Sequence, residues 1–275
     1  YIQYTLNDYE TEGLEKGVPP VGQRIETFKM LVNKLGKGRV IWRFDPMIIT
    51  DKISIEDLLW KVQNIGDQLR GYTDWRRNGT EKLVFSFADI VSYHKVMANL
   101  EKNGINYIEW NENLMNEFAA MLSKMNRERG WNFELATCGE KIDIDTYGIK
   151  HNRCIDDDLM IRFAYRDKEL MDFLKVEVKM VQPSAPSMFE EFEDRLLIPD
   201  GAIMLTSDTY AVKRKKNKDK GQRQFCGCIV SKDIGQYNTC PHLCEYCYAN
   251  TSKEAALANW KRHNNNHHFD TITGQ

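Results

Sequence analysis

The sequence predicts an α/β protein built around a parallel sheet, on two observations. Four short runs rich in apolar, β-branched or aromatic residues have the composition of strands: YIQYTL (1–6), RVIWRFDP (39–46), LVFSFAD (83–89) and NFELATC (132–138). Each run is followed by a longer segment, and three of these segments repeat apolar residues at helical spacing. Strands that alternate with helices pair in parallel through right-handed crossovers, which indicates an open sheet or a barrel.

The segments between the strands predict helices over residues 21–36, 54–71 and 111–130, with a shorter one from about 90 to 103. Ser54 and Asp57 have the spacing of a capping box at the start of the second helix. Helix ends are expected at three glycines, Gly36, Gly71 and Gly130.

The number of βα units suggests only part of a barrel. Four units are too few to close the usual eight-stranded barrel. The chain begins at Tyr1 with a segment that already alternates like a strand. We therefore expect a parallel (βα)n partial TIM-like barrel that lacks N-terminal units and carries a C-terminal Cys-rich segment.

The pattern changes after the barrel-like part, which we expect to span residues 1–163. Residues 164–221 hold a Pro-punctuated stretch and a basic run, VKRKKNKDKGQR, and are expected to form an irregular connector or insert. Residues 222–275 form a Cys-rich segment that we expect to pack on the barrel. A helix over 251–263 closes it, with Thr251 and Glu254 as its expected capping box.

Composition excludes several protein classes. At 275 residues, 42% hydrophobic and a net charge of −2, the chain resembles an ordinary globular protein that can bury a sizeable core. No run reaches the roughly eighteen apolar residues of a membrane span, and the mild acidity does not support strong nucleic-acid binding. The seven cysteines cluster instead of spreading like a disulfide framework, so a reducing cytoplasm and a metal site are expected.

Three of the cysteines, Cys240, Cys244 and Cys247, lie in YNTCPHLCEYCYAN (237–250) with three residues and then two between them. Thiolates at this spacing can converge from one loop on a single metal centre, which favours an iron–sulfur cluster. A four-iron cubane with three cysteine ligands leaves one iron open to a small molecule. Zinc is the main alternative, with His242 as a possible fourth ligand, and a purely structural group of thiols is the third interpretation.

The same spacing, with Tyr246 before the last cysteine, resembles the motif of the radical S-adenosylmethionine superfamily, and the loop is similar to that of spore photoproduct lyase. The chain also resembles a prokaryotic domain-of-unknown-function family with such a C-terminal cluster, through RVIWRFDPMIIT, SFAD, LATCGEKIDIDTYGIKHNRCIDDDL, KDKGQRQFCGCIVSKDIGQYNTCPHLCEYCYANTSKE and DTITG. Members of that family usually begin with further βα units and have a shorter connector than residues 164–212.

The resemblance implies a 4Fe-4S cluster, S-adenosylmethionine on the open iron, an external electron donor and reductive cleavage to a 5′-deoxyadenosyl radical. It gives no substrate. It also implies that Tyr246 belongs to the cofactor-binding loop. Two alternatives stay open, a non-catalytic iron–sulfur protein for electron transfer or redox sensing, and a zinc-stabilised binding module.

The remaining cysteines could form a second site. Cys138 ends a predicted strand, Cys154 follows in the next segment, and Cys226 and Cys228 flank a glycine that lets both sulfurs point one way. Four thiols are a full ligand set for a second cluster or a zinc ion. The alternative is that one or two of them are plain buried thiols.

Polar residues follow the predicted strands at their carboxyl ends: Arg43 and Asp45, Ser86 and Asp89, Thr137 and Glu140. In a parallel α/β fold these ends converge on one crevice. We therefore expect Arg43 and Asp45 to contact the cofactor, and Arg43, Asp45 and Glu140 to be the candidate catalytic residues. The structural alternative is that the Arg–Asp pair satisfies itself and that Asp45 shapes a turn before Pro46.

Overall fold

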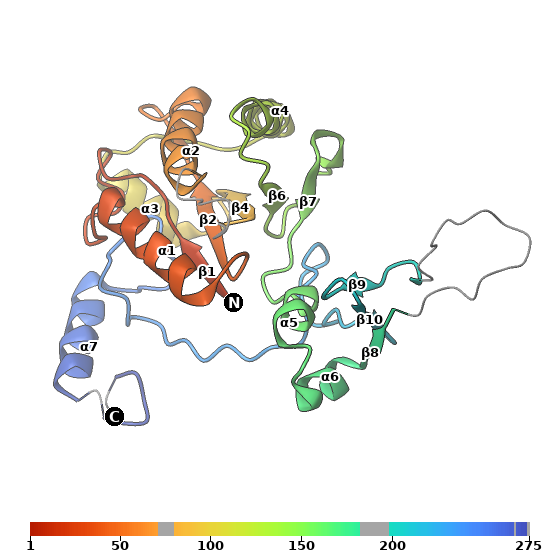
Figure 1. Ribbon diagram of the computed structural model, residues 1–275. Coiled ribbons are helices and arrows are strands. Elements are labelled where there is room, and N and C mark those ends of the chain that lie inside the picture. Colours follow the sequence, from red (N-terminus) through yellow and green to blue (C-terminus); the bar gives the residue numbers. More distant parts are fainter. Residues whose placement is uncertain (71–79, 182–197, 267, 274–275) are drawn as a thin grey trace, which may run out of the picture. The chain divides into compact units, whose positions relative to one another are not determined.

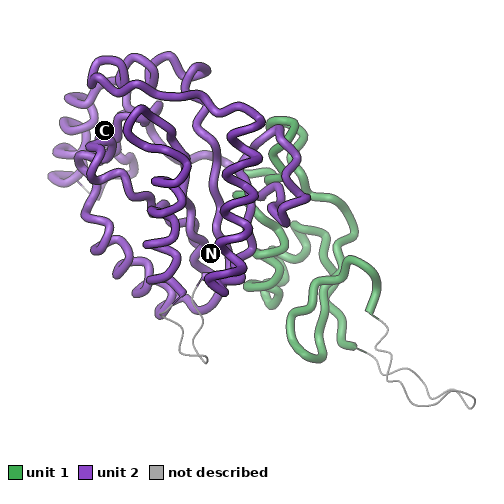
Figure 2. Tube along the Cα trace, turned by 90° about the horizontal axis from the view of Figure 1, so that it is seen from above, with its two compact units in different colours: residues 1, 153–231 green, residues 2–152, 232–275 purple. Residues whose placement is uncertain are grey.

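The computed structural model of the chain describes residues 1–70, 80–181, 198–266 and 268–273. The chain separates into two compact units. The larger holds residues 2–152 and 232–275, and the smaller holds Tyr1 and residues 153–231 (Figure 2).

The larger unit is built on a parallel sheet of five strands (Figure 1). In spatial order these are β1 (Ile2–Thr5), β2 (Val40–Met47), β4 (Lys82–Phe87), β6 (Glu134–Thr137) and β7 (Ile149–His151). All four pairings between neighbours are parallel. The prediction of a parallel α/β fold is confirmed, and β7 adds a strand that the sequence analysis did not find. In the described part of the chain the sheet stays open, with β1 and β7 as its edges.

The helices of the larger unit lie where the spacing of apolar residues predicts them. They are α1 (Val21–Leu35), α2 (Ile55–Arg70), α3 (His94–Lys102), α4 (Glu112–Glu128) and the late α7 (Lys253–Asn265). Two short strands, β3 (Ile49–Thr50) and β5 (Tyr107–Ile108), pair antiparallel, and a 3₁₀ turn, η1, covers Asp145–Tyr147.

The predicted helix caps are confirmed in part. Asp57 N donates to Ser54 Oγ at 3.2 Å, and Ser54 N donates to the Asp57 carboxylate at 2.9 Å, as in a capping box. Gly36 caps α1, and Gly130 follows α4 with a positive φ of 60°. Gly71, the expected end of α2, lies outside the described residues.

The cap expected at Thr251 is wrong by one residue. Ser252 is the N-cap of α7 and its hydroxyl accepts from Ala255 N at 3.1 Å. The Thr251 hydroxyl instead donates to Asn238 Oδ1 at 2.7 Å, which holds the start of α7 to the preceding loop. Both residues can cap, so the pattern alone did not separate them.

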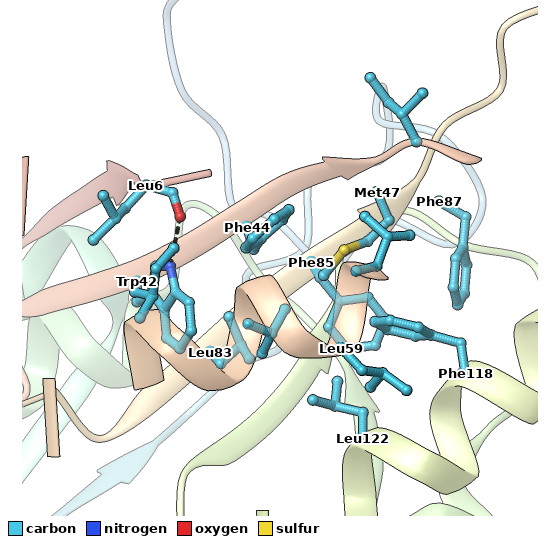
Figure 3. Close-up of a cluster of buried hydrophobic side chains, with 14 of the residues drawn as sticks. Leu6, Trp42, Phe44, Met47, Leu59, Leu83, Phe85, Phe87, Phe118 and Leu122 are labelled. Atoms are coloured by element: carbon cyan, nitrogen blue, oxygen red, sulfur yellow. Dashed lines mark hydrogen bonds between the residues drawn. The ribbon is translucent and has the colours of Figure 1, made fainter. Parts of the chain in front are cut away.

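One face of the sheet forms the core of the larger unit. Trp42 and Phe44 of β2 and Phe85 of β4 are fully buried, and the Trp42 indole donates to Leu6 O at 2.9 Å. Figure 3 shows Phe85 and its neighbours packed against side chains of α2 and α4, among them Leu59, Phe118 and Leu122. Because side chains alternate along a strand, the residues between these aromatic positions lie on the opposite face.

The smaller unit corrects the expectation of an irregular segment over residues 164–221. It contains α5 (Asp157–Ala164), α6 (Lys168–Leu174) and an antiparallel sheet of β8 (Val176–Met180), β10 (Thr209–Lys213) and β9 (Ile203–Met204). The alternation in VEVKM and TYAVK produces these strands, and it was masked by the Pro-rich and basic stretches around it. Lys213, the first lysine of the basic run, pairs with Asp157 and Asp158.

None of the helices in the described ranges has the length and apolar character needed to cross a membrane.

Candidate functional site

The face of the sheet opposite the aromatic core carries polar side chains. Arg43 and Asp45 alternate with Trp42 and Phe44 along β2, and Ser86 alternates with the core positions of β4. These polar residues are half-buried, whereas the alternate positions are fully buried. The sheet therefore has one apolar face and one face that is polar toward the carboxyl ends of its strands.

Asp45 joins two of the predicted site residues. Its carboxylate forms an ion pair with Arg43 and accepts a hydrogen bond from the Ser86 hydroxyl. Arg43 also donates to Gln3 Oε1 of β1 at 2.8 Å. The Arg43 and Asp45 side chains keep 18% and 20% of their surface exposed, so the pair is satisfied internally and still faces solvent. Both interpretations of the pair, structural and functional, fit this geometry.

The other strand-end residues differ in placement. The Glu140 carboxylate accepts from Phe87 N at 2.9 Å, which ties the segment after β6 to the end of β4. Asp89 is exposed and accepts from Ser92 N at 3.3 Å, in a local turn. Thr137 is fully buried, and its hydroxyl has no hydrogen-bond partner among the described residues. The structure thus joins Glu140 to the end of β4, whereas the hydrogen bond given for Asp89 is to a nearby residue of its own turn.

Asn7 is the residue through which the Cys-rich segment reaches the sheet. It follows β1, is fully buried, and accepts from Asp45 N at 2.9 Å. Its amide nitrogen lies 3.0 Å from the Tyr246 hydroxyl and 3.2 Å from both Glu15 Oε1 and Asp45 O. Asn7 therefore links the backbone of β2 beside the Arg43–Asp45 pair to the loop that carries the cysteines.

Tyr246 is anchored by charge as well as by packing. Its hydroxyl donates to the buried carboxylate of Glu15, which forms an ion pair with buried Arg24 at 3.1 Å. Burial, followed by the charges of Glu15 and Cys244, raises the pKa of Tyr246 well above its ordinary value. The phenol is therefore a permanent hydrogen-bond donor at neutral pH. Its ring also packs edge-on against Tyr9, with centroids 5.9 Å apart.

Glu245, next to Tyr246, anchors the loop on its other side. Its carboxylate is buried and lies 2.9 Å from Lys16 Nζ and 2.7 Å from Lys253 Nζ. Burial opposes the charge, but hydrogen bonds from Lys253 and Lys16 outweigh it and lower the pKa of Glu245. Its backbone N donates to Leu14 O at 2.9 Å.

Gly17 allows the segment after β1 to approach the Cys-rich loop closely. Gly17 N donates to His242 O at 2.9 Å. A Cβ at this position would lie 2.7 Å from the carbonyl oxygens of Pro241 and His242, which is closer than atoms of this kind approach. His242 itself is exposed. The glycine is therefore required by the contact between the two segments.

The three cysteines of the loop lie near one another. Cys240 is exposed, and Cys244 and Cys247 are half-buried. Burial is the main cause that raises the pKa of Cys244 to about 12, and the charges of Glu15, Cys240 and Cys247 add to it. Cys247 N donates to Cys244 O at 3.1 Å, and Asn250 donates to Cys240 O at 2.9 Å. The loop is thus closed on itself by hydrogen bonds.

A small pocket of about 40 Å³ opens beside two of these sulfurs. It is lined by Cys244 and Cys247, by Lys95 and Asn99 of α3, and by the start of α7. The Lys95 ammonium is buried and has no hydrogen-bond partner among the described residues. A buried cation without a partner is unfavourable, so this position suits an anionic group.

The four other cysteines are divided between the units. Cys138 belongs to the larger unit, where its backbone N donates to Phe85 O at 2.9 Å after the end of β6. Cys154, Cys226 and Cys228 belong to the smaller unit. None of the seven cysteines forms a disulfide.

Sequence reasoning missed several residues that position the loop. Asn7 follows the first strand and obeys the same strand-end rule that selects Arg43 and Ser86, so it could have been found. Glu15, Lys95 and Glu245 carry no such signal, because each acts through a contact with a distant segment.

Comparison with known proteins identifies a family. The model of a family described as "Domain of unknown function (DUF1848)" matches residues 1–249. That range contains all seven cysteines. It also contains the candidate-site residues from Asn7 to Cys247. Neither the curated proteins nor the solved structures contain a significant match. The expected resemblance to an uncharacterised family is confirmed at this level.

Proposed function

We propose that this chain, which belongs to the DUF1848 family, is an iron–sulfur enzyme of radical S-adenosylmethionine type. The observation that carries the proposal is the hydrogen bonding that holds the cysteine loop against the sheet. Tyr246, between Cys244 and Cys247, is hydrogen-bonded to Asn7, which in turn holds the backbone of Asp45. The loop is thereby tied to the carboxyl ends of parallel strands, where α/β proteins place their ligands.

The ligand set suits a cluster better than a single zinc ion. One zinc ion with bonds of about 2.3 Å holds its sulfurs about 3.8 Å apart. Among the described residues, the sole group of three candidate ligand atoms that all lie within 4.8 Å of one another is Asp156, Asp157 and Asp158. At least one pair of sulfurs in the triplet is therefore more than 4.8 Å apart, which is wider than the pair spacing around one zinc ion. A cubane separates its cysteine sulfurs, since each binds a different iron.

Lys95 supports an anionic occupant of the pocket. A cluster with three thiolate ligands carries negative charge, and an ammonium beside Cys244 and Cys247 would offset it. This explains why an unpartnered cation is buried there at all.

When bound, such a cluster supplies one electron to S-adenosylmethionine, whose sulfonium–C5′ bond breaks to give methionine and a 5′-deoxyadenosyl radical. The electron comes from an external one-electron donor. The substrate that the radical attacks is not identified by the residues described. Because none of the seven cysteines forms a disulfide, we place this chemistry in a reducing, cytoplasmic setting.

The residues on the polar face of the sheet have proposed roles around the cofactor. Arg43 is suited to a carboxylate and Asp45 to an amine or a ribose hydroxyl, since both keep part of their surface exposed. Glu140 holds the end of β4 and is the third candidate. Tyr246 positions the loop through its hydroxyl and reaches the cofactor through its backbone.

The finer architecture that we infer is a partial TIM-like barrel. The strand order follows the sequence without reversal. With right-handed crossovers, this order puts every connecting helix on the same face, as in a barrel wall. The polar face would then be the inner face of that wall.

The test is anaerobic reconstitution of the full chain with iron and sulfide, followed by electron paramagnetic resonance of the reduced protein. The proposal expects S-adenosylmethionine to change the spectrum and 5′-deoxyadenosine to accumulate with a reductant. A cluster whose spectrum is unaltered and that gives no cleavage would favour electron transfer instead. Zinc in place of iron after anaerobic purification would favour the binding module. Cys244→Ala is expected to lose the chromophore.

A further inference from the structure

The smaller unit gathers three cysteines outside the site described above. Cys154 lies three positions before the start of α5, and Cys226 and Cys228 lie more than 70 positions further along the chain. Two contacts hold these segments together. Ile229 N donates to Ile155 O at 3.1 Å, and Ile155 N donates to Cys228 Sγ at 3.3 Å.

The three sulfurs are neighbours within this unit. Cys228, which is 6% exposed, forms a side-chain hydrogen bond with Cys226 and interacts electrostatically with Cys154. Cys154 and Cys226 are half-buried. The Tyr1 hydroxyl donates to Cys154 O at 2.8 Å and accepts from Asp156 N at 2.7 Å, which fixes the backbone on both sides of Ile155. Three partly shielded thiols therefore meet on a backbone that is already ordered.

Gly227 is needed for this convergence. A Cβ there would lie 2.7 Å from Cγ of Arg153, so only glycine lets the segment between Cys226 and Cys228 pack against the residue before Cys154.

We propose that Cys154, Cys226 and Cys228 hold a second iron–sulfur cluster in the smaller unit. Cysteine sulfur is the usual ligand of such clusters, and a backbone N–H donated to a ligand sulfur is one of the contacts that stabilise them. The sulfurs are not all within 4.8 Å of one another, which is wider than one zinc ion requires. The proposal does not depend on the function proposed for the larger unit.

The nearby carboxylates do not compete as a cation site. Asp156, Asp157 and Asp158 bring their oxygens together, but Arg153 pairs with all three of them. Lys213 pairs with two, so the acidic group is neutralised by side chains. The cysteine sulfurs are the soft ligands of this unit. Thiolates bind iron in the form of iron–sulfur clusters, so we expect iron to bind here when sulfide is also supplied.

The experiment separates the two cysteine triplets. The full chain with Cys240, Cys244 and Cys247 all changed to alanine is reconstituted anaerobically with ferrous iron and sulfide, desalted, and analysed for iron, acid-labile sulfide and visible absorption. The proposal expects iron, acid-labile sulfide and a brown chromophore to remain, and the retained iron is about half of the wild-type content when the first triplet also holds a cluster. Addition of Cys154→Ala, Cys226→Ala and Cys228→Ala should remove the rest.

A second variant guards against loss of folding. In the same background, Gly227→Ala leaves all three proposed ligands in place and should lower the retained iron severalfold. Gly221→Ala is the matched control, since the nearest atom to its Cβ would be 3.4 Å away. The proposal is overturned if the first variant retains no iron or sulfide, if it binds only zinc, or if its iron survives removal of the second triplet. None of these outcomes bears on S-adenosylmethionine cleavage by the first triplet.

Discussion

The Asn7 amide donates to the Tyr246 hydroxyl at 3.0 Å, across 239 positions of the chain. This contact couples the residue that follows the first strand to the loop that carries three cysteines. Because Asn7 also accepts from Asp45 N, a shift of the loop would move Asn7 and disturb its hydrogen bond to the end of β2. The loop is therefore part of the sheet end and not an appended tail.

Removal of the Tyr246 hydroxyl tests this coupling. Tyr246→Phe removes one hydrogen-bond donor from the buried Glu15 carboxylate and one acceptor from the Asn7 amide, which should lower the free energy of unfolding by about 1–3 kcal/mol. Urea denaturation of the metal-free protein measures the loss. Tyr248→Phe is the control, because that side chain is 57% exposed and its ring contact with Tyr93 survives the change. Equal stability of the two variants would contradict the anchoring role.

A methyl group at Gly17 should disturb the loop without touching a ligand. Gly17→Ala places Cβ against the Pro241 and His242 carbonyls, so we expect a loss of about 1–3 kcal/mol, typical of overpacking, and weaker iron retention. Gly22→Ala, inside α1 with open space around it, should be neutral or stabilising by up to about 1 kcal/mol. If Gly17→Ala retained iron as the wild type does, the close approach would be irrelevant to the site.

The ion pairs of Glu245 predict a pH dependence. The pKa of Glu245 is lowered in the folded state, so its contribution to stability is complete above the unfolded value of about 4.3 and is lost as pH falls through the folded value. Glu245→Gln should cost about 1–2 kcal/mol at pH 7, and the difference from wild type should shrink below about pH 4. Urea denaturation from pH 7 to 3.5 measures it.

The control for that series is Glu128→Gln, whose ion pair with Lys124 is exposed and 3.8 Å long, and which should change stability little at any pH. A Glu245→Gln difference that stays constant down to pH 3.5 would show that charge is not the cause.

Replacement of Lys95 should affect the stability of the metal-free protein and the cluster potential of the reconstituted protein. Lys95→Met removes an unpartnered buried cation, so the metal-free protein should be equally stable or more stable by about 1 kcal/mol. In the reconstituted protein, loss of a positive charge beside Cys244 should shift the cluster potential to a more negative value. Spectroscopic redox titration measures the shift. Lys102→Met, at an exposed position of the same helix, should leave the potential unchanged.

The strand-end pair can be tested without loss of the cluster. Asp45→Asn should reduce cleavage of S-adenosylmethionine roughly ten- to a hundredfold, the usual effect of one hydrogen bond to a charged group, while iron content stays constant. Asp89→Asn, in its exposed turn, should have little effect on cleavage. Equal cleavage by both variants would assign the Arg43–Asp45 pair a structural role only. The assay is quantification of 5′-deoxyadenosine.

Strong local patterns made most of the larger unit predictable. The strands around Trp42 and Phe85 combine β-branched and aromatic residues, and the helices repeat apolar positions, so both were found. Strand β7, with three residues, is too short to show a period. The strands β8 and β10 alternate clearly but were hidden by their basic and Pro-rich surroundings.

The sequence also predicted only some of the residues of the candidate site. The rule that parallel strands present their carboxyl ends together was enough to select Arg43 and Asp45, which the structure joins with Ser86. The partners of Tyr246 could not be read from the sequence, because nothing local marks the pairing of Glu15 with a residue 231 positions later. For the same reason, the sequence could not show that Cys138 lies in a different compact unit from Cys154.

The long separation between Glu15 and Tyr246 also orders events during synthesis. A ribosome would release every strand of the parallel sheet before the cysteine loop emerges. The hydrogen bond between the Tyr246 hydroxyl and the Glu15 carboxylate can therefore form only after the strands have been synthesised. Contacts of this span form late, after the intervening chain has become compact. Under the proposed function, iron is therefore expected to be delivered in the final step of maturation, onto a scaffold that has already folded.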